Sequence, residues 1–290
     1  MTTTTISNQI KIVECPRDAM QGIHDFISTD KKVAYINQLL KVGFDTIDFG
    51  SFVSPKAIPQ MADTAQVLER LDTGSVSKLL SIIGNVRGAE EAVKYARIHY
   101  LGFPFSISET FQQRNVNSTI LESVERVKEI KRLCDNNGKQ LMIYISMGFG
   151  NPYGDAWSAD VASKWVEQLV QMDIRHISLA DTIGIANPES IQYLFSHLIP
   201  QFPEVEFGAH LHTTPDAWLE KIDAAFQSGC RRFDGAIKGL GGCPMAADDL
   251  TGNMATENII QYFDYESAET GLDKFEFRES VRKALETFPI

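Results

Sequence analysis

Short runs of β-branched and aromatic residues alternate with longer amphipathic segments along most of the chain. The short runs have the length and composition of buried strands, and the longer segments have the spacing of helices that pack on a sheet. We predict strands at Lys11–Glu14, Thr46–Phe49, Leu79–Ile83, Tyr100–Phe105, Leu141–Ile145, His176–Leu179, Val205–His210 and Arg232–Ile237. We predict helices between them at Lys31–Val42, Ala57–Leu71, Ala89–Arg97, Ile120–Asn136, Ser158–Met172, Pro188–Leu198, Pro215–Ser228 and Met254–Phe263.

This alternation predicts an α/β fold with a parallel sheet, and eight strand–helix units are the number that closes a (β/α)₈ TIM barrel. An open, doubly wound sheet is the alternative. It is disfavoured because no G-x-G-x-x-G follows the first strand. The residues after Gly271 have the pattern of a short C-terminal helical extension. Without a repeat or a low-complexity linker, we expect one domain over residues 1–290.

Composition narrows the function classes only slightly. The 290 residues are 43% apolar and carry a net charge of −11, which disfavours binding to nucleic acid or to anionic membranes. Residues 1–7 lack the charged and apolar regions of a signal peptide, and no stretch is apolar enough to span a membrane. The four cysteines are dispersed. We therefore expect a cytoplasmic protein in a reducing environment.

The pair His210-x-His212 stands at the end of the seventh predicted strand. Residues two apart on a strand point to the same side, so both imidazoles can face one point. Together with a carboxylate they suit a divalent cation, and further oxygen ligands would favour Mg²⁺ or Mn²⁺ over zinc. Two ordinary histidines at a strand end are the alternative.

Other polar residues follow the ends of other strands, where catalytic groups of such barrels lie. Asp18 could ligate a cation while Arg17 stabilises an enolate oxygen, or the two could form a surface ion pair. Asp181 is a strand-end carboxylate or a turn residue. Cys243, in a glycine-rich run, is a general acid or a small turn residue. Asn253 offers a carbonyl ligand or caps a helix.

These residues, in this order, resemble the 3-hydroxy-3-methylglutaryl-CoA lyase family of metal-dependent TIM-barrel lyases. The resemblance runs from Lys11 to about Asn258. The matching stretches are Pro16-Arg17-Asp18, Ser51 to Lys56 with Pro59-Gln60-Met61, Ile177-Ser178-Leu179, Asp181 to Gly184, His210-x-His212, Gly239 to Pro244, Gly252-Asn253 and Ala255-Thr256-Glu257.

The resemblance implies a role for each residue. The ligands of Mg²⁺ or Mn²⁺ would be Asp18, His210, His212 and Asn253. Arg17 would neutralise the enolate oxygen of the departing acetyl-CoA, and Cys243 would lie on a loop that closes over the substrate and help transfer protons. Gln21 and Asp181 would lie in the substrate pocket. The family further implies an acyl-CoA substrate, acetyl-CoA and acetoacetate as products, a homodimer, and a place in leucine catabolism.

The chain departs from the family at several positions. Asp48 stands where the family usually has Glu, so a carboxylate remains with a shorter reach. The loop after Cys243 is one residue longer and more acidic, and Thr213 replaces an Asp. Further differences are Lys238, Met245 and Asn151. They leave open a lyase or condensing enzyme for a related 3-hydroxyacyl-CoA such as citramalyl-CoA. A non-catalytic scaffold would have lost Arg17 or the metal set, and the sequence keeps both.

Overall fold

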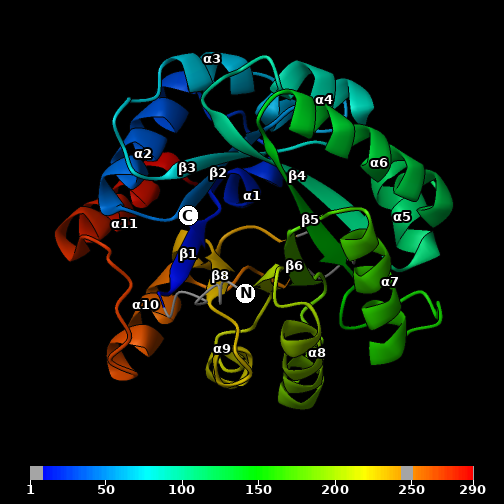
Figure 1. Cartoon of the computed structure of the whole chain (residues 1–290). Coiled ribbons are helices and arrows are strands. Elements are labelled where there is room, and N and C mark those ends of the chain that lie inside the picture. Colours follow the sequence, from blue (N-terminus) through cyan, green and yellow to red (C-terminus); the bar gives the residue numbers. More distant parts are fainter. Residues whose placement is uncertain (1–8, 243–250, 290) are drawn as a thin grey trace, which may run out of the picture.

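The computed structural model describes residues 9–242 and 251–289 and shows a closed barrel of eight parallel strands ringed by helices (Figure 1). Neighbouring strands follow the chain order, and the last strand pairs with the first. The predicted TIM barrel is confirmed, and each predicted strand is present within two residues at either end. The strands are β1 (Lys11–Glu14), β2 (Thr46–Ser51), β3 (Lys78–Ile82), β4 (Ile98–Ser106), β5 (Gln140–Ser146), β6 (His176–Asp181), β7 (Glu206–Leu211) and β8 (Arg232–Gly235).

The helices agree less closely with the prediction. They are α1 (Pro16–Gln21), α2 (Thr29–Val42), α3 (Thr64–Glu69), α4 (Val86–Ala92), α5 (Glu109–Val116), α6 (Ile120–Asn136), α7 (Ala159–Gln171), α8 (Pro188–Gln201), α9 (Trp218–Gln227), α10 (Thr256–Tyr265) and α11 (Lys274–Thr287), with 3₁₀ turns η1 (Pro59–Met61) and η2 (Ile237–Gly239). The short helices α1 and α5 were not predicted.

The helix predicted over 57–71 is in fact η1 followed by α3. Side chains account for the break, because they take backbone carbonyls that a continuous helix would use. The ammonium of Lys32 donates to the carbonyl of Gln60, and the hydroxyl of Thr64 donates to that of Met61. The break places Gln60 so that its side chain accepts from the backbone N–H of Ile27, which fixes the loop that follows α1.

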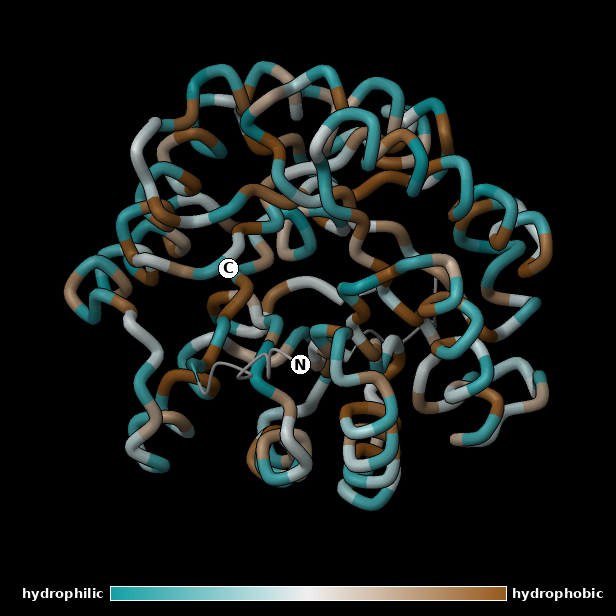
Figure 2. The backbone as a smooth tube through the Cα atoms, in the orientation of Figure 1, coloured by the Kyte–Doolittle hydropathy of each residue, from teal (hydrophilic) through white to brown (hydrophobic). Residues whose placement is uncertain are grey.

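Apolar residues fill the layer between the strands and the helices, and hydrophilic residues lie along the outer sides of the helices (Figure 2). Inside the barrel the N-terminal end is closed by Arg232, whose guanidinium lies 5.7 Å from the centre of the Tyr100 ring. Its Nη1 donates to carboxylates of Asp45 (3.1 Å) and Glu206 (3.2 Å). Because this end is packed shut, a ligand can enter only from the C-terminal end.

The expected C-terminal extension is α11, which packs beside α2 (Figure 1). The rings of Tyr35 and Phe288 meet edge to face with centres 5.4 Å apart, and the backbone N–H of Asp273 donates to the carbonyl of Val42. In residues 9–242 and 251–289, no helix has both the length and the apolar character that a membrane crossing needs.

A buried carboxyl group joins the end of β1 to η2 and to the start of α10. Glu14 accepts from the hydroxyl of Thr256 (2.5 Å) and from the backbone N–H of Ile237 (3.0 Å). Burial raises the pKa of Glu14 from 4.5 to about 8, although these two hydrogen bonds oppose the shift. The carboxyl is therefore protonated in the folded protein at neutral pH and ionised in the unfolded chain, so its contribution to stability falls as pH rises through this range.

Replacing Glu14 with Gln, which mimics the protonated acid, should stabilise the protein increasingly from pH 4.5 to pH 8 relative to wild type. The gain should grow by at most about 1.4 kcal/mol per pH unit and reach a few kcal/mol in total. Urea unfolding of both proteins at pH 5 and pH 8 measures it, since all other titrations cancel in the difference. A difference that stays constant with pH would contradict the assignment.

Candidate active site

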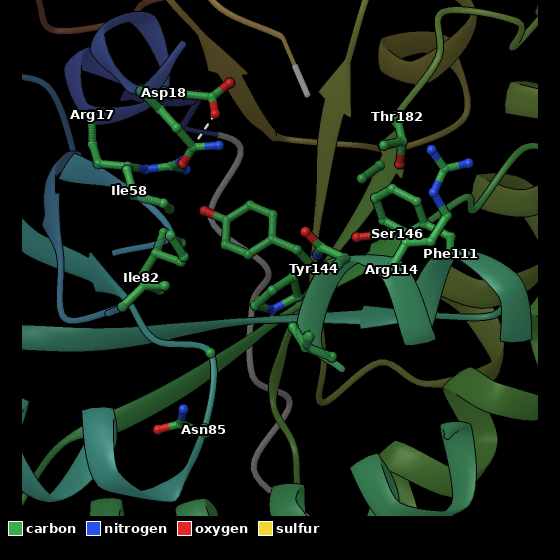
Figure 3. Close-up of a pocket in the computed structure, with 18 of the residues that line it drawn as sticks. Arg17, Asp18, Ile58, Ile82, Asn85, Phe111, Arg114, Tyr144, Ser146 and Thr182 are labelled. Carbon is green, nitrogen blue, oxygen red and sulfur yellow. Dashed lines mark hydrogen bonds and ion pairs between the residues drawn. The ribbon is translucent and has the colours of Figure 1, made fainter. Parts of the chain in front are cut away.

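A cavity of about 320 Å³ opens at the C-terminal ends of the strands. Figure 3 shows the ring of Tyr144 in the middle of it, with Arg17 and Asp18 on one side and Ser146 and Arg114 on the other. The hydroxyl of Tyr144 is buried and has no hydrogen-bond partner among the described residues. The cavity therefore brings together charged groups from opposite sides of the barrel around an unpaired hydroxyl.

Three of the predicted metal ligands meet at the edge of this cavity. Asp18 lies on α1, which follows β1. His210 lies near the end of β7, and His212 comes just after that strand. One ligand atom from each lies within 4.8 Å of the others, and the two imidazole centres are 5.3 Å apart. The alternation of side chains along β7 places both rings on the same side, as the sequence predicted.

The hydrogen bonding of these residues fits a divalent cation. His212 is only 2% exposed, yet neither ring nitrogen has a hydrogen-bond partner among the described residues. A buried imidazole left unpaired is costly unless a ligand takes one nitrogen. His210 instead uses Nδ1, which lies 3.1 Å from Oδ2 of Asp234, so Nε2 is the nitrogen left for a cation. A carboxylate behind the imidazole is the usual arrangement of a histidine ligand.

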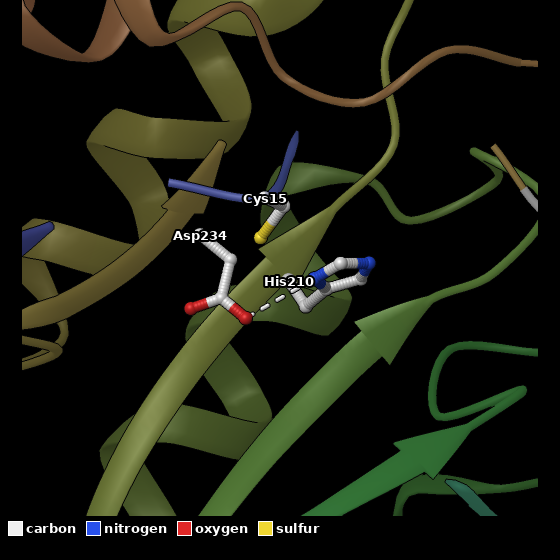
Figure 4. Close-up of side chains that lie close together, drawn as sticks. All are labelled: Cys15, His210 and Asp234. Atoms are coloured by element: carbon white, nitrogen blue, oxygen red, sulfur yellow. Dashed lines mark hydrogen bonds and ion pairs between the residues drawn. The ribbon is translucent and has the colours of Figure 1, made fainter. Parts of the chain in front are cut away.

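A second group of close side chains consists of Cys15, His210 and Asp234 (Figure 4), and it shares His210 with the first. The thiol of Cys15 is buried and directed to the carbonyl of Val13 (3.9 Å). Burial and the neighbouring carboxylates raise the pKa of this thiol well above its ordinary value, so it stays protonated. This group supports His210 from behind, with Asp234 setting the ring orientation.

Asn253 lies beside the three ligands. The backbones of Asn253 and His212 pair as a single antiparallel β-bridge. The side-chain Nδ2 of Asn253 donates to the carboxylate of Asp18 (2.7 Å) and to the carbonyl of Leu240 (2.8 Å). Gly241 makes this approach possible, because a Cβ there would lie 2.7 Å from Nδ2 of Asn253 and its φ is +93°. The contact is through nitrogen, and ligation through the carbonyl oxygen of Asn253 stays a prediction.

Arg17 contacts the metal group (the three predicted ligands Asp18, His210 and His212) through Asp18, and it also lines the cavity. Its Nε and Nη2 both donate to Oδ2 of Asp48 (2.9 and 2.6 Å), and its Nη1 donates to Asp18 (2.8 Å) and Gln21 (2.7 Å). A guanidinium has five N–H donors. Four are engaged, and one on Nη2 is left. Arg17 is thus a fixed, buried cation with one donor to offer.

The charges of the site depend on each other. Burial raises the pKa of Asp48 to about 6, although Arg17 opposes the shift. The pKa of Asp18 is lowered, because Arg17 and both imidazoles outweigh the effect of burial. Burial and the neighbouring His210 lower the pKa of His212 to about 4, whereas Asp234 raises that of His210. At neutral pH, His212 is therefore a neutral imidazole, which is the form that binds cations.

The remaining predicted residues are placed differently. Gln21 lines the cavity, as predicted. Asp48 and Asp181 are each 1% exposed and are not among the residues that line it. The carboxylate of Asp181 accepts from Lys221 (2.7 Å) and from the backbone N–H of Ala186 (3.0 Å), so contact with substrate stays a prediction that these bonds do not support. Cys243 lies outside the described residues.

The sequence analysis missed Asp234, Lys221, Tyr144 and Arg114. Asp234 had a signal, since Arg232-x-Asp234 puts two charges on the same face of a buried strand. Lys221 had one too, because it interrupts the apolar face of α9 formed by Trp218, Ile222 and Ala225. Tyr144 and Arg114 carry no pattern that distinguishes them from other aromatic and basic residues.

The chain is similar in sequence and in fold to known proteins. A family model described as HMGL-like matches residues 9–283. The hydroxymethylglutaryl-CoA lyase YngG of Bacillus subtilis is 32% identical over 93% of this chain and 90% of its own length. A 3-hydroxy-3-isohexenylglutaryl-CoA/hydroxymethylglutaryl-CoA lyase of Pseudomonas aeruginosa is 32% identical over 92% and 89%. An HMG-CoA lyase structure from Acinetobacter baumannii, in complex with coenzyme A and 3-methylmalate, superposes with a TM-score of 0.89 at 33% identity, covering 97% of this chain and 92% of the other.

Proposed function

The chain belongs to the HMGL-like family, and from this premise we propose that it cleaves 3-hydroxy-3-methylglutaryl-CoA into acetyl-CoA and acetoacetate. The observation that carries the proposal is the group of Asp18, His210 and His212 beside Arg17 at the open end of the barrel. A scaffold protein would have no need of two unpaired imidazole nitrogens and a fixed guanidinium at the edge of a cavity.

The reaction breaks the bond between C2 and C3 of the substrate. The C3 hydroxyl loses its proton, its oxygen becomes the ketone of acetoacetate, and the electron pair of the broken bond moves onto the thioester as an enolate. Asp18, His210 and His212 would hold a divalent cation. Such a cation would lower the pKa of the substrate hydroxyl. The enolate then takes up a proton at C2 and leaves as acetyl-CoA.

In this proposal Arg17 stabilises the enolate oxygen. Its remaining N–H is fixed in place because Asp48 and Gln21 hold the guanidinium through the other donors. A donor that needs no reorganisation is the kind that stabilises developing charge. Asp48 therefore acts by positioning Arg17, which is consistent with its absence from the residues that line the cavity.

The rest of the cavity suits an acyl-CoA. Ile58 and Ile82 give it an apolar wall near Arg17 (Figure 3). Arg114 is exposed at the opposite side, where its guanidinium lies 5.1 Å from the centre of the Tyr153 ring. It makes no ion pair within residues 9–242 and 251–289, so we expect it to face an anionic part of the substrate.

We further propose Mg²⁺ or Mn²⁺ as the cation, a homodimer as the assembly and the cytoplasm as the location, with a role in leucine catabolism. The alternative substrate is a related 3-hydroxyacyl-CoA such as citramalyl-CoA, and the condensing direction of the same chemistry belongs with it. The observation that favours this alternative is Asp48. It accepts from Arg17 at a position where the family usually has the longer Glu.

A coupled assay for acetyl-CoA release from 3-hydroxy-3-methylglutaryl-CoA tests the proposal. We expect turnover with Mg²⁺ or Mn²⁺, its loss on chelation, and its return when the cation is restored. Citramalyl-CoA serves as the comparison substrate. Turnover of citramalyl-CoA alone would reject the proposed acyl group and keep the mechanism. Turnover that survives complete chelation would reject the mechanism.

A further inference from the structure

The two histidines of the metal group are held in different ways. His210 is oriented through its ring, by the contact between Nδ1 and Asp234. The ring of His212 has no carboxylate behind it and makes no close hydrogen bond among the described residues; its polar neighbour is the backbone of Thr182. A histidine ligand usually donates its second nitrogen to a carboxylate or carbonyl partner. With no close partner for the ring, the direction of the His212 side chain depends strongly on how its backbone is held.

That backbone is tied on both sides. On one side, the N–H of Thr213 donates to the carbonyl of Gly252 (3.0 Å), and the N–H of Met254 donates to that of Leu211 (3.1 Å). On the other side, the ammonium of Lys221 donates to the carbonyl of His212 itself (2.8 Å). Lys221 is thus the one side chain of the described residues that donates to the His212 backbone.

Lys221 reaches this carbonyl from α9 and is only 2% exposed. Its three ammonium donors are all used, by His212, by the carbonyl of Gly184 (2.9 Å) and by the carboxylate of Asp181 (2.7 Å). Asp181 ends β6 and Gly184 lies in the loop that follows, so one ammonium joins the ends of two neighbouring strands. Burying a lysine is costly, and a fully paired lysine at this junction fixes three groups at once.

We propose that Lys221 is a positioning residue for the metal site, which aims the His212 ligand by holding its backbone, and that Asp181 serves this site as the counter-ion of Lys221. This inference rests on the proposed function, because it takes the group of Asp18, His210 and His212 as the cation ligands. It assigns Asp181 a place behind the metal site and outside the substrate pocket.

The test is the affinity for Mn²⁺, measured by calorimetry and by the electron paramagnetic resonance signal of the bound ion. Lys221→Met should weaken Mn²⁺ binding about 10- to 100-fold, the loss typical of removing an outer partner of a ligand. A second variant, Lys221→Met with Asp181→Asn, removes the unpaired buried charge and keeps the test available if the single variant does not fold. It should show the same loss of affinity.

Lys32→Met is the matched control. Lys32 is also 2% exposed, and its ammonium donates to the carboxylate of Asp63 (2.6 Å) and to the carbonyl of Gln60. It touches no residue of the metal group. Its replacement should lower the unfolding temperature as the Lys221 change does and leave Mn²⁺ affinity within about twofold of wild type.

The outcomes separate the two claims. If the wild type binds Mn²⁺ and both Lys221 variants bind it with the same affinity, the inference is overturned and the proposed function stands. Equal weakening by Lys32→Met would also overturn it, because the effect would then follow general destabilisation. Absence of Mn²⁺ binding by the wild type would reject the metal site on which both rest.

Discussion

Arg17→Gln is expected to lower kcat for acetyl-CoA release about 100- to 1,000-fold, the loss seen when a single preorganised oxyanion donor is removed. The guanidinium is held by Asp48, Asp18 and Gln21, and only one of its donors is left to meet an enolate oxygen. Gln is neutral and shorter, so neither the charge nor the geometry survives. Steady-state assays at saturating substrate and Mn²⁺ measure the effect.

Mn²⁺ affinity should be kept or should rise in this variant. Arg17 lies 2.8 Å from a carboxylate oxygen of Asp18, where its charge opposes that of a bound cation. Lost turnover with intact metal binding would place the effect on the substrate side of the site. The matched control is Arg232→Gln, which removes a buried, carboxylate-paired arginine from the other end of the barrel. It should cost stability and spare kcat. An Arg17→Gln enzyme within about threefold of wild type would contradict the assigned role.

The fold was largely predictable because both faces of a parallel barrel are covered. Buried strands then become continuous apolar runs that stand out against polar helix surfaces, and all of them were found in the sequence. The short helices were not. α1 begins with Pro16 immediately after β1, and α5 has only eight residues, so neither offers enough turns for a periodic pattern.

The site was predictable where two ligands stand two residues apart at the end of one strand. His210 and His212 are two residues apart, and that spacing fixes their relation without knowledge of the fold. Asp18 needs the further knowledge that the ends of β1 and β7 face the same opening. Lys221 and Asp234 could not be assigned in this way, because each meets its partner only after distant elements pack. The carboxylate of Asp181 illustrates the limit: the sequence places it at a strand end, and only the structure shows that Lys221 occupies it.

Asp18→Asn is expected to weaken Mn²⁺ binding about 100-fold or more, beyond the loss typical of outer partners. Asp18 is the only carboxylate in the described group that also contains both imidazoles, so its replacement leaves a neutral set of ligands. The pKa of Asp18 is held below its ordinary value by Arg17, His210 and His212, despite burial. The group is therefore ionised throughout the neutral range, and the variant removes a full charge. Calorimetric titration with Mn²⁺ measures the loss, and turnover should return only at much higher cation concentrations.

Asp45→Asn is the appropriate comparison, because Asp45 is likewise paired with a buried arginine and likewise has a lowered pKa. It stands at the closed end of the barrel, where a lost ion pair should affect unfolding and leave the cation site alone. If Asp18→Asn lost Mn²⁺ affinity and Asp45→Asn did not, the loss would belong to the ligand set. Unchanged affinity in Asp18→Asn would mean that the cation is held elsewhere, and the proposed metal-assisted cleavage at this group would have to be abandoned.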